Sequence, residues 1–236
     1  MKLLDQRICA WSGIIFMFLM GCFMVMPGFV PPPSPSLDAS HIAAIYRERT
    51  QAIRIGTFLA MYGAIPYTMF IGVISVQMFR IKGISRLTPY LQLVAGIGAV
   101  LVYLLPVILF AVIAFRPERD PALTLFGNDI GWQFIITNVP IVQVQFGAIA
   151  LAVLQDKSAN PVFPRWIAFV NIWLAVIFVP APVAFFFKTG PFAWNGLFTF
   201  WLPAIGFFIW AAAMVWALLR AISAEERERA GSGVVP

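Results

Sequence analysis

Six long apolar blocks, separated by short polar stretches, constrain this chain more than any other feature of its sequence. Each block holds about 20 residues or more, the length of helix that crosses the ~30 Å hydrocarbon core of a bilayer. Backbone groups inside lipid must be hydrogen-bonded within the protein, and a helix meets that requirement by itself. Spans are expected at about 9–30, 57–79, 89–115, 132–155, 166–187 and 196–220.

Composition supports the same interpretation. The chain is 61% hydrophobic and 11% charged, whereas soluble domains carry about 25% charged residues. The sequence therefore predicts an all-α integral membrane protein, a six-transmembrane-helix bundle with Pro-kinked helices. Residues 1–222 are expected to form a single polytopic membrane domain, with outer loops at 31–56 and 116–131. Residues 223–236 are expected to be a flexible, charged cytoplasmic tail.

The positive charges predict an orientation. Ten Lys and Arg residues fall on the side of the N-terminus and six on the other side. Cytoplasmic loops carry the excess of these residues, so both termini are predicted to be cytoplasmic, in a bacterial inner membrane or its equivalent. The net charge is +6. Because the basic residues stand beside the spans, they are expected to contact the lipid bilayer, and nucleic acid is not an expected partner.

The first apolar block has two interpretations. Basic residues precede it, and the sequence ending at Cys22 resembles a lipoprotein cleavage site. The apolar run nevertheless continues to Val30 with no small-x-small cleavage site, which favours an uncleaved first span.

The connection over 31–56 contains its own helix signal. Several prolines stop the first span, and Asp38 or Ser40 then offers an N-cap for a new helix. Apolar residues recur on one face of this helix, which is therefore predicted to be amphipathic. It is either an interfacial lid or docking helix, or a solvated lead-in to the second span. The residues available there for interactions are Asp38, His41, Tyr46, Arg47, Glu48 and Arg49.

The block at 132–155 is the most polar of the six. On a straight helix Asn138 and Gln145 share one face, whereas Gln133 and Gln143 lie on roughly the opposite face. Amides in hydrocarbon need hydrogen-bonding neighbours, so this helix is expected in the middle of the bundle, although a proline kink could shift these faces. The candidate intramembrane polar site comprises Asn138, Gln143, Gln145, Tyr62, Tyr67, Tyr103 and Asn171.

Every expected span after the first contains proline. Under the predicted orientation all of these prolines lie in the outer half of the bilayer. Proline removes a backbone hydrogen bond and can bend a helix, so a common depth favours an outer half that opens into a cavity. Proline is also commoner in membrane helices generally, which explains any single one. The candidate kink positions are Pro66, Pro106, Pro140, Pro180 and Pro203.

No Asp, Glu, Lys, Arg or His lies inside the six expected spans, and Arg220 stands at the very end of the sixth. Proton relays, ion-coupled carriers and many membrane enzymes depend on such groups. His41 is the only histidine, so a multi-histidine metal site or a haem with two histidine ligands cannot come from this chain alone. No cofactor, metal site or catalytic residue is predicted, and the balance of the sequence is against an enzyme.

Three functions remain, in the following order. The first is a non-catalytic accessory or docking subunit of a membrane assembly, because small residues at four-residue spacing let a partner or second copy approach. The alternative is a transporter or channel-like carrier of a small apolar or weakly polar solute, without ion coupling through intramembrane charges. A lipid-modifying enzyme comes last because its candidate groups are scattered: Asp38, His41, Glu48, Asp120 and Asp129.

Overall fold

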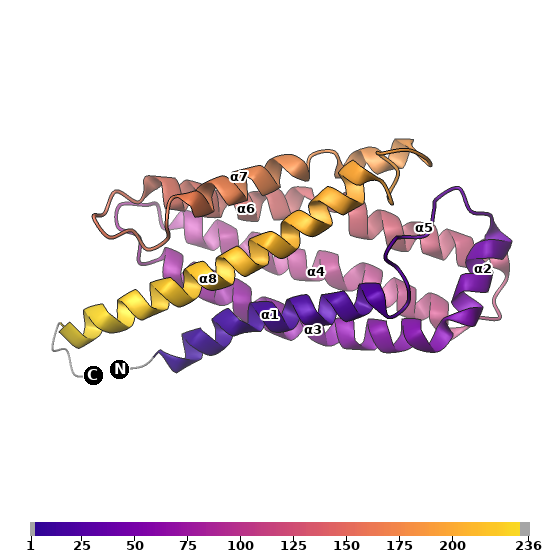
Figure 1. Ribbon diagram of the computed structural model, residues 1–236, viewed down its shortest axis with the longest axis horizontal. Coiled ribbons are helices and arrows are strands. Elements are labelled where there is room, and N and C mark those ends of the chain that lie inside the picture. Colours follow the sequence, from indigo (N-terminus) through magenta and orange to yellow (C-terminus); the bar gives the residue numbers. More distant parts are fainter. Residues whose placement is uncertain (1–2, 232–236) are drawn as a thin grey trace.

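The structure, a computed structural model that describes residues 3–231, is a bundle of helices (Figure 1). Within that range there is no strand, and six helical segments are long and apolar enough to cross a membrane. The predicted fold class is therefore confirmed. The elements are α1 (Leu4–Val25), α2 (Ala39–Glu48), α3 (Thr50–Met78), α4 (Leu87–Phe115), α5 (Pro121–Thr137), α6 (Pro140–Gln155), α7 (Trp166–Ile177), the 3₁₀-helix η1 (Ala181–Phe186), the π-helix η2 (Leu197–Trp201) and α8 (Leu202–Gly231).

The long helices run along the bundle, and α2 lies across one of its ends (Figure 1). We call this the loop end, and we call the opposite end, where α1 begins and α8 finishes, the terminal end. Helix α1 packs on α3, α3 on α4, and α4 on both α5 and α6, while α8 closes the bundle against α1 and α7.

The core divides into two clusters along the bundle. The cluster toward the terminal end is built around the buried Trp210, which Phe70 and Phe146, also buried, each meet edge-to-face. The cluster toward the loop end contains Phe110 and Trp132, whose ring centroids lie 5.4 Å apart. Aromatic pairs at this spacing add to the packing that holds membrane helices together.

Three of the six spans are not single α-helices. The fourth consists of α5 and α6, joined through Asn138 and Val139, which are not helical. The fifth consists of α7 followed by η1, and the sixth begins with η2 before continuing as α8. Pro140 opens α6, where its missing N–H removes no intrahelical bond. Of the other candidate kink positions, Pro66 and Pro106 lie inside α3 and α4, Pro180 precedes η1, and Pro203 is the second residue of α8.

The expected outer loop over 116–131 is helical for most of its length, because α5 begins at Pro121. Asp120 caps this helix by accepting a hydrogen bond from the Ala122 N–H at 2.8 Å. The fourth span therefore has 35 residues, about 52 Å of helix against a hydrocarbon core of about 30 Å. Asp129 belongs to this helical segment. A stretch of about 20 residues, counted back from Gln155, fills the hydrocarbon core and reaches only Ile136. Asp129 therefore lies about two helical turns outside that stretch.

The expected flexible tail is likewise helical over residues 223–231, which continue α8; residues 232–236 lie outside the described range. Glu226 accepts hydrogen bonds from the Leu3 N–H at 2.8 Å and from Arg7 Nη2 at 2.6 Å. Glu225 is buried and accepts from Gln77 Nε2 at 2.8 Å. These bonds tie the last turns of α8 to α1 and α3, so the charged segment is fixed.

The predicted amphipathic helix is α2, and it is separate from α3. Asp38 caps it by accepting from the His41 N–H at 3.0 Å. Ile42 and Tyr46 are buried on the face that packs against the bundle, mainly against α5. Helix α2 therefore covers the loop end with its apolar face already in contact.

Candidate binding cavity

A cavity of about 170 Å³ lies within the bundle, between α1, α3, α4, the α5–α6 junction, η1 and the start of the sixth span. It is lined by Phe16, Met20, Met24, Tyr67, Ala99, Val102, Tyr103, Ile135, Ile136, Val139, Val142, Phe178, Ala181, Thr199, Phe200, Pro203, Ala204, Phe207 and Phe208. An engineered apolar cavity of about 150 Å³ in another protein stays dry and binds benzene or xenon, which sets the scale of a fitting ligand.

The cavity lies where three spans depart from α-helical geometry. Val139 belongs to the α5–α6 junction, and Ala181 is the first residue of η1. Phe200 belongs to η2, where the Trp201 N–H bonds the Gly196 carbonyl five residues earlier at 3.3 Å. Irregular backbone at membrane depth is tolerated where it is buried in protein or lines a cavity, and each of these three segments contributes to the cavity wall.

The interior of the cavity is almost entirely apolar. None of the described residues that line it is charged. The Tyr103 hydroxyl donates to the Ala60 carbonyl at 2.8 Å, and the Thr199 hydroxyl donates to the Ala193 carbonyl. The Tyr67 hydroxyl, in contrast, forms no hydrogen bond within the described chain. It is therefore the polar group that remains available to a molecule in the cavity.

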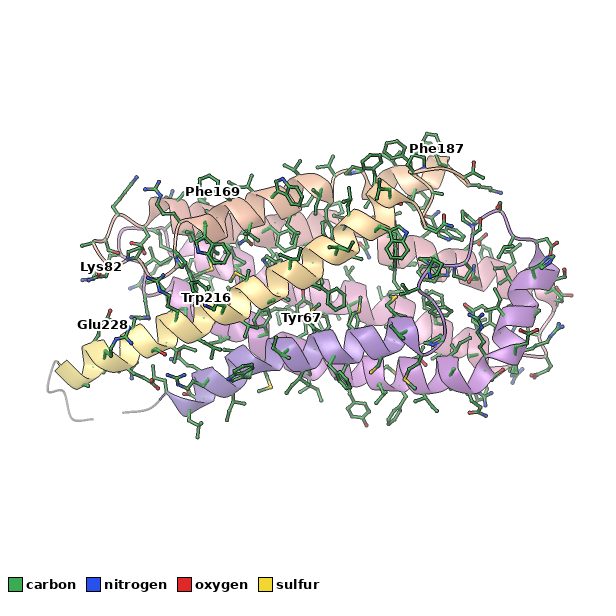
Figure 2. All side chains as sticks on the ribbon, viewed as in Figure 1. Tyr67, Lys82, Phe169, Phe187, Trp216 and Glu228 are labelled. Atoms are coloured by element: carbon green, nitrogen blue, oxygen red, sulfur yellow. The ribbon has the colours of Figure 1, made fainter. Side chains whose placement is uncertain are left out.

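Stacking fixes the position of Tyr67. Its ring lies 4.2 Å from that of Phe16, centroid to centroid, with only 8° between the ring planes. Phe16 in turn meets Tyr103 edge-on at 5.3 Å. Figure 2 shows Tyr67 near the middle of the bundle's length. Contacts between α1, α3 and α4 thus hold one wall of the cavity.

The structure brings only part of the predicted polar set together. Tyr67 and Tyr103 share the cavity, whereas Tyr62 lies on the outside of α3 with 55% of its surface exposed. Asn171 is buried elsewhere, where its oxygen accepts from Trp210 Nε1 at 2.9 Å. Gln143 donates to the Ala175 carbonyl at 3.0 Å and so joins α6 to α7. These polar side chains are distributed among several helix contacts.

Asn138 and Gln145 do not share a continuous helical face, because the α5–α6 junction separates them. Asn138 lies at the junction itself. Gln145 is fully buried on α6, and neither its amide nitrogen nor its oxygen has a partner within the described chain. The amide nitrogen of Gln92 on α4 is likewise unpaired, while its oxygen accepts from the Ser75 hydroxyl.

The predicted interaction residues of the 31–56 connection mainly hold that connection in place. Hydrogen bonds from Ser40 and the His41 N–H lower the pKa of Asp38 below its ordinary value. Arg47 Nε donates to the Pro117 carbonyl at 3.3 Å, and Arg49 Nη1 donates to the Pro27 carbonyl at 3.1 Å. Glu48 is exposed.

Tyr46 carries the contact of α2 with α5. Its hydroxyl donates to the Asn128 oxygen at 3.2 Å. Burial, and secondarily the Asp129 carboxylate, raise the pKa of Tyr46 well above its ordinary value. The scattered acidic candidates show no cluster, and within residues 3–231 no three His, Cys, Asp or Glu side chains are placed to hold a metal ion.

The lining phenylalanines were not among the predicted site residues; they are Phe16, Phe178, Phe200, Phe207 and Phe208. In the sequence they are visible only as part of the high aromatic content of the spans. Phenylalanines that face lipid contribute to the same content, so the sequence does not separate the two kinds. The prolines were the better indicator, since Pro203 lines the cavity and Pro140 follows directly on the lining residue Val139.

The fold and the cavity together define a multi-pass helical membrane protein with an apolar cavity that is partly open between its helices. Nothing among protein-family models, curated proteins or solved structures matches this chain significantly, so its function is argued from the site alone.

Proposed function

We propose that this protein binds a small, largely apolar molecule with one hydrogen-bonding group in the cavity, as a carrier that works without ion coupling. The observation that carries the proposal is the coincidence of the cavity with the irregular segments of three spans. Transporters place substrates at discontinuous helices near the bilayer midplane, where non-helical backbone and cavity occur together.

The lining defines the class of molecule. An uncharged wall of aromatic and aliphatic side chains disfavours an ion, because a charge would have no compensating partner there. A volume of about 170 Å³ suits a molecule near the size of benzene. The unpaired Tyr67 hydroxyl adds a preference for one polar group, as in a phenol.

The test compares benzene and phenol binding to the purified protein, by saturation-transfer NMR in detergent, for the wild type and Tyr67→Phe. Loss of one hydrogen bond costs about 0.5–1.5 kcal/mol, so phenol affinity should fall roughly 2- to 12-fold. Benzene affinity should stay unchanged, since it makes no hydrogen bond with the hydroxyl.

A second variant locates the binding. Ala99→Leu places three more carbons into the cavity and should abolish binding of both molecules. Ala212→Leu makes the same chemical change on an exposed position of α8 and should bind both normally. If Ala99→Leu binds like the wild type, the molecules partition into detergent or another surface, and the proposal fails.

Carrier activity is a separate step. Proteoliposomes loaded with a fluorescent phenol should release it faster than protein-free vesicles, without any dependence on a proton or sodium gradient. Ala99→Leu should remove the acceleration. A gradient-dependent rate would contradict uncoupled transport.

We also propose, as a second candidate, an accessory subunit that docks through exposed phenylalanines between α7 and α8. Phe185 and Phe186 are 63% and 82% exposed. Figure 2 shows Phe187 at the upper edge of the bundle, in the half nearer the loop end, and its ring lies 5.8 Å from that of Phe192.

Gentle extraction of the tagged protein, followed by mass determination, tests the docking candidate. A stoichiometric partner polypeptide that is lost in the Phe186→Ala/Phe187→Ala double variant would support it. Phe169→Ala, on the exposed face of α7, is the control and should retain the partner. Recovery of the chain alone would contradict this candidate.

A further inference from the structure

A second, polar pocket of about 440 Å³ lies at the terminal end, away from the cavity. Its walls are the last turns of α8 and the 156–165 turn that joins α6 to α7. The polar residues that line it are Arg80, Asn160, Arg220, Arg227 and Glu228. Figure 2 shows Glu228 on α8 at this end.

The pocket has an excess of positive charge. Arg80 is neutralised, because its Nη2 lies 2.7 Å from the Glu228 carboxylate and its Nε lies 3.6 Å from Glu225. Arg220 and Arg227 are seven residues apart on α8 and therefore project from one face. Neither forms an ion pair with a carboxylate of the described chain. Two guanidinium groups thus face one pocket without a counter-ion.

Exposed tryptophans beside the pocket indicate the level of a membrane interface. The Arg220 guanidinium lies 6.0 Å from the ring centroid of Trp216. Trp216 pairs with Trp166, with 5.5 Å between centroids, and both are exposed on the outside of the bundle. Exposed tryptophans at the ends of spans mark the headgroup region.

The wall opposite α8 is a fixed structure. Asp156 is buried and accepts hydrogen bonds from the Ser158 N–H at 3.0 Å and the Val162 N–H at 2.9 Å. This network closes the turn on itself and positions Asn160 at the pocket. The pocket is therefore formed before any ligand arrives.

We propose that this pocket binds the phosphate group of an anionic phospholipid through Arg220 and Arg227. Arginine presents planar donors that match phosphate oxygens, and basic pockets between transmembrane helices on the cytoplasmic side bind acidic headgroups. The predicted orientation places this end in the cytoplasm. The inference is independent of the cavity, which shares no lining residue with the pocket.

Native mass spectrometry of the delipidated protein, titrated with phosphatidylglycerol or phosphatidylcholine, tests the proposal. The wild type should bind phosphatidylglycerol at least about tenfold more tightly, because this lipid keeps a net negative charge for the two arginines, whereas the choline of phosphatidylcholine neutralises its own phosphate. Arg220→Gln/Arg227→Gln should remove that preference. Both side chains are exposed, so the double variant should fold.

The matched control is Lys82→Gln/Arg86→Gln, which removes two charges from the exposed α3–α4 turn at the same end. Figure 2 shows Lys82 at this end of the bundle. The control should keep the lipid preference. If it loses the preference equally, general surface charge explains the binding and the proposal is overturned.

Competition with inorganic phosphate tests whether the bound phosphate group belongs to a lipid headgroup or to a soluble compound. Millimolar phosphate should fail to displace phosphatidylglycerol from the wild type, because a lipid also gains from its acyl chains in the membrane-facing surface. Displacement of the lipid by millimolar phosphate would overturn the assignment to a lipid and identify a soluble phosphate compound instead.

Discussion

Gln145 should weaken the bundle, so replacement by leucine should stabilise the protein. The side chain is fully buried, and both polar atoms of its amide are unpaired within the described chain. It faces α4 at Gly96, where an added β-carbon would lie 3.2 Å from the amide nitrogen. An unpaired buried polar group costs about 1–3 kcal/mol, and leucine removes both groups while keeping similar volume.

The expected size of the effect is smaller than the sum of the two penalties. Leucine gains no hydrophobic energy relative to lipid, and hydrogen bonds measured inside a membrane protein average about 0.6 kcal/mol, with a maximum of about 1.7. We expect the free energy of unfolding to rise by about 1–2 kcal/mol for Gln145→Leu. That change should raise Tm by about 2–8 °C for a chain of this length.

Asn171→Leu is the matched control, because it makes the same chemical change at a paired amide. Asn171 accepts from Trp210 Nε1 at 2.9 Å and donates to the Ile167 carbonyl at 2.8 Å. Leucine would leave the buried indole N–H unpaired, so the free energy of unfolding should fall by about 1–3 kcal/mol. Two amide-to-leucine changes in one bundle should therefore shift Tm in opposite directions.

Circular dichroism at 222 nm, recorded during heating in one detergent, measures both shifts. The refuting result is a Tm for Gln145→Leu that falls as it does for Asn171→Leu. The Gln145 amide would then be hydrogen-bonded in the folded protein, for example to a buried water. The lack of a protein partner would not mean that the amide destabilises the bundle.

The other predictions concern the two ends of the bundle. Glu225→Gln should lower the free energy of unfolding by about 1–3 kcal/mol, measured by the same melts, because Arg80 loses one of its two carboxylates. The lowered pKa of Asp38 means that the ionised cap stabilises α2 above pH about 4 and that this stabilisation is lost as the pH falls further. Amide exchange of α2 should therefore become faster relative to the rest of the bundle at low pH. Asp38→Asn should abolish this pH dependence. The raised pKa of Tyr46 means that stability should fall as pH rises above about 10, because only the unfolded phenol then ionises; Tyr46→Phe should reduce that slope while losing the bond to Asn128.

The number of spans could be predicted from the sequence because lipid imposes a length on apolar blocks. The start of α5 could not, since residues 121–131 have mixed polarity and resemble a loop. Their helix is supported by contacts that only the folded chain supplies, such as Tyr46 with Asn128. The fixed end of α8 was missed for the same reason, because Arg7 lies more than 200 residues from Glu226.

Polarity identified the amides of the spans but could not distinguish their roles. Asn171 has partners on its own helix and on α8, Gln143 bonds the backbone of α7, and Gln145 has none within the described chain. Each outcome depends on which neighbour faces the side chain, and a helical wheel gives only the direction. The α5–α6 junction also shifts that direction between Asn138 and Gln145.

Stability and binding are located at different depths of this bundle. At the terminal end, Glu225, Glu226 and their partners join α1, α3 and α8 through charged hydrogen bonds. Near the middle, the spans break around the cavity, and Tyr67 retains an unpaired hydroxyl. A change at Ala99 should therefore alter binding without disturbing the charged network, whereas Glu225→Gln should lower Tm and leave phenol affinity unchanged. The joint loss of both properties in either variant would show that the two regions fold and bind as one unit.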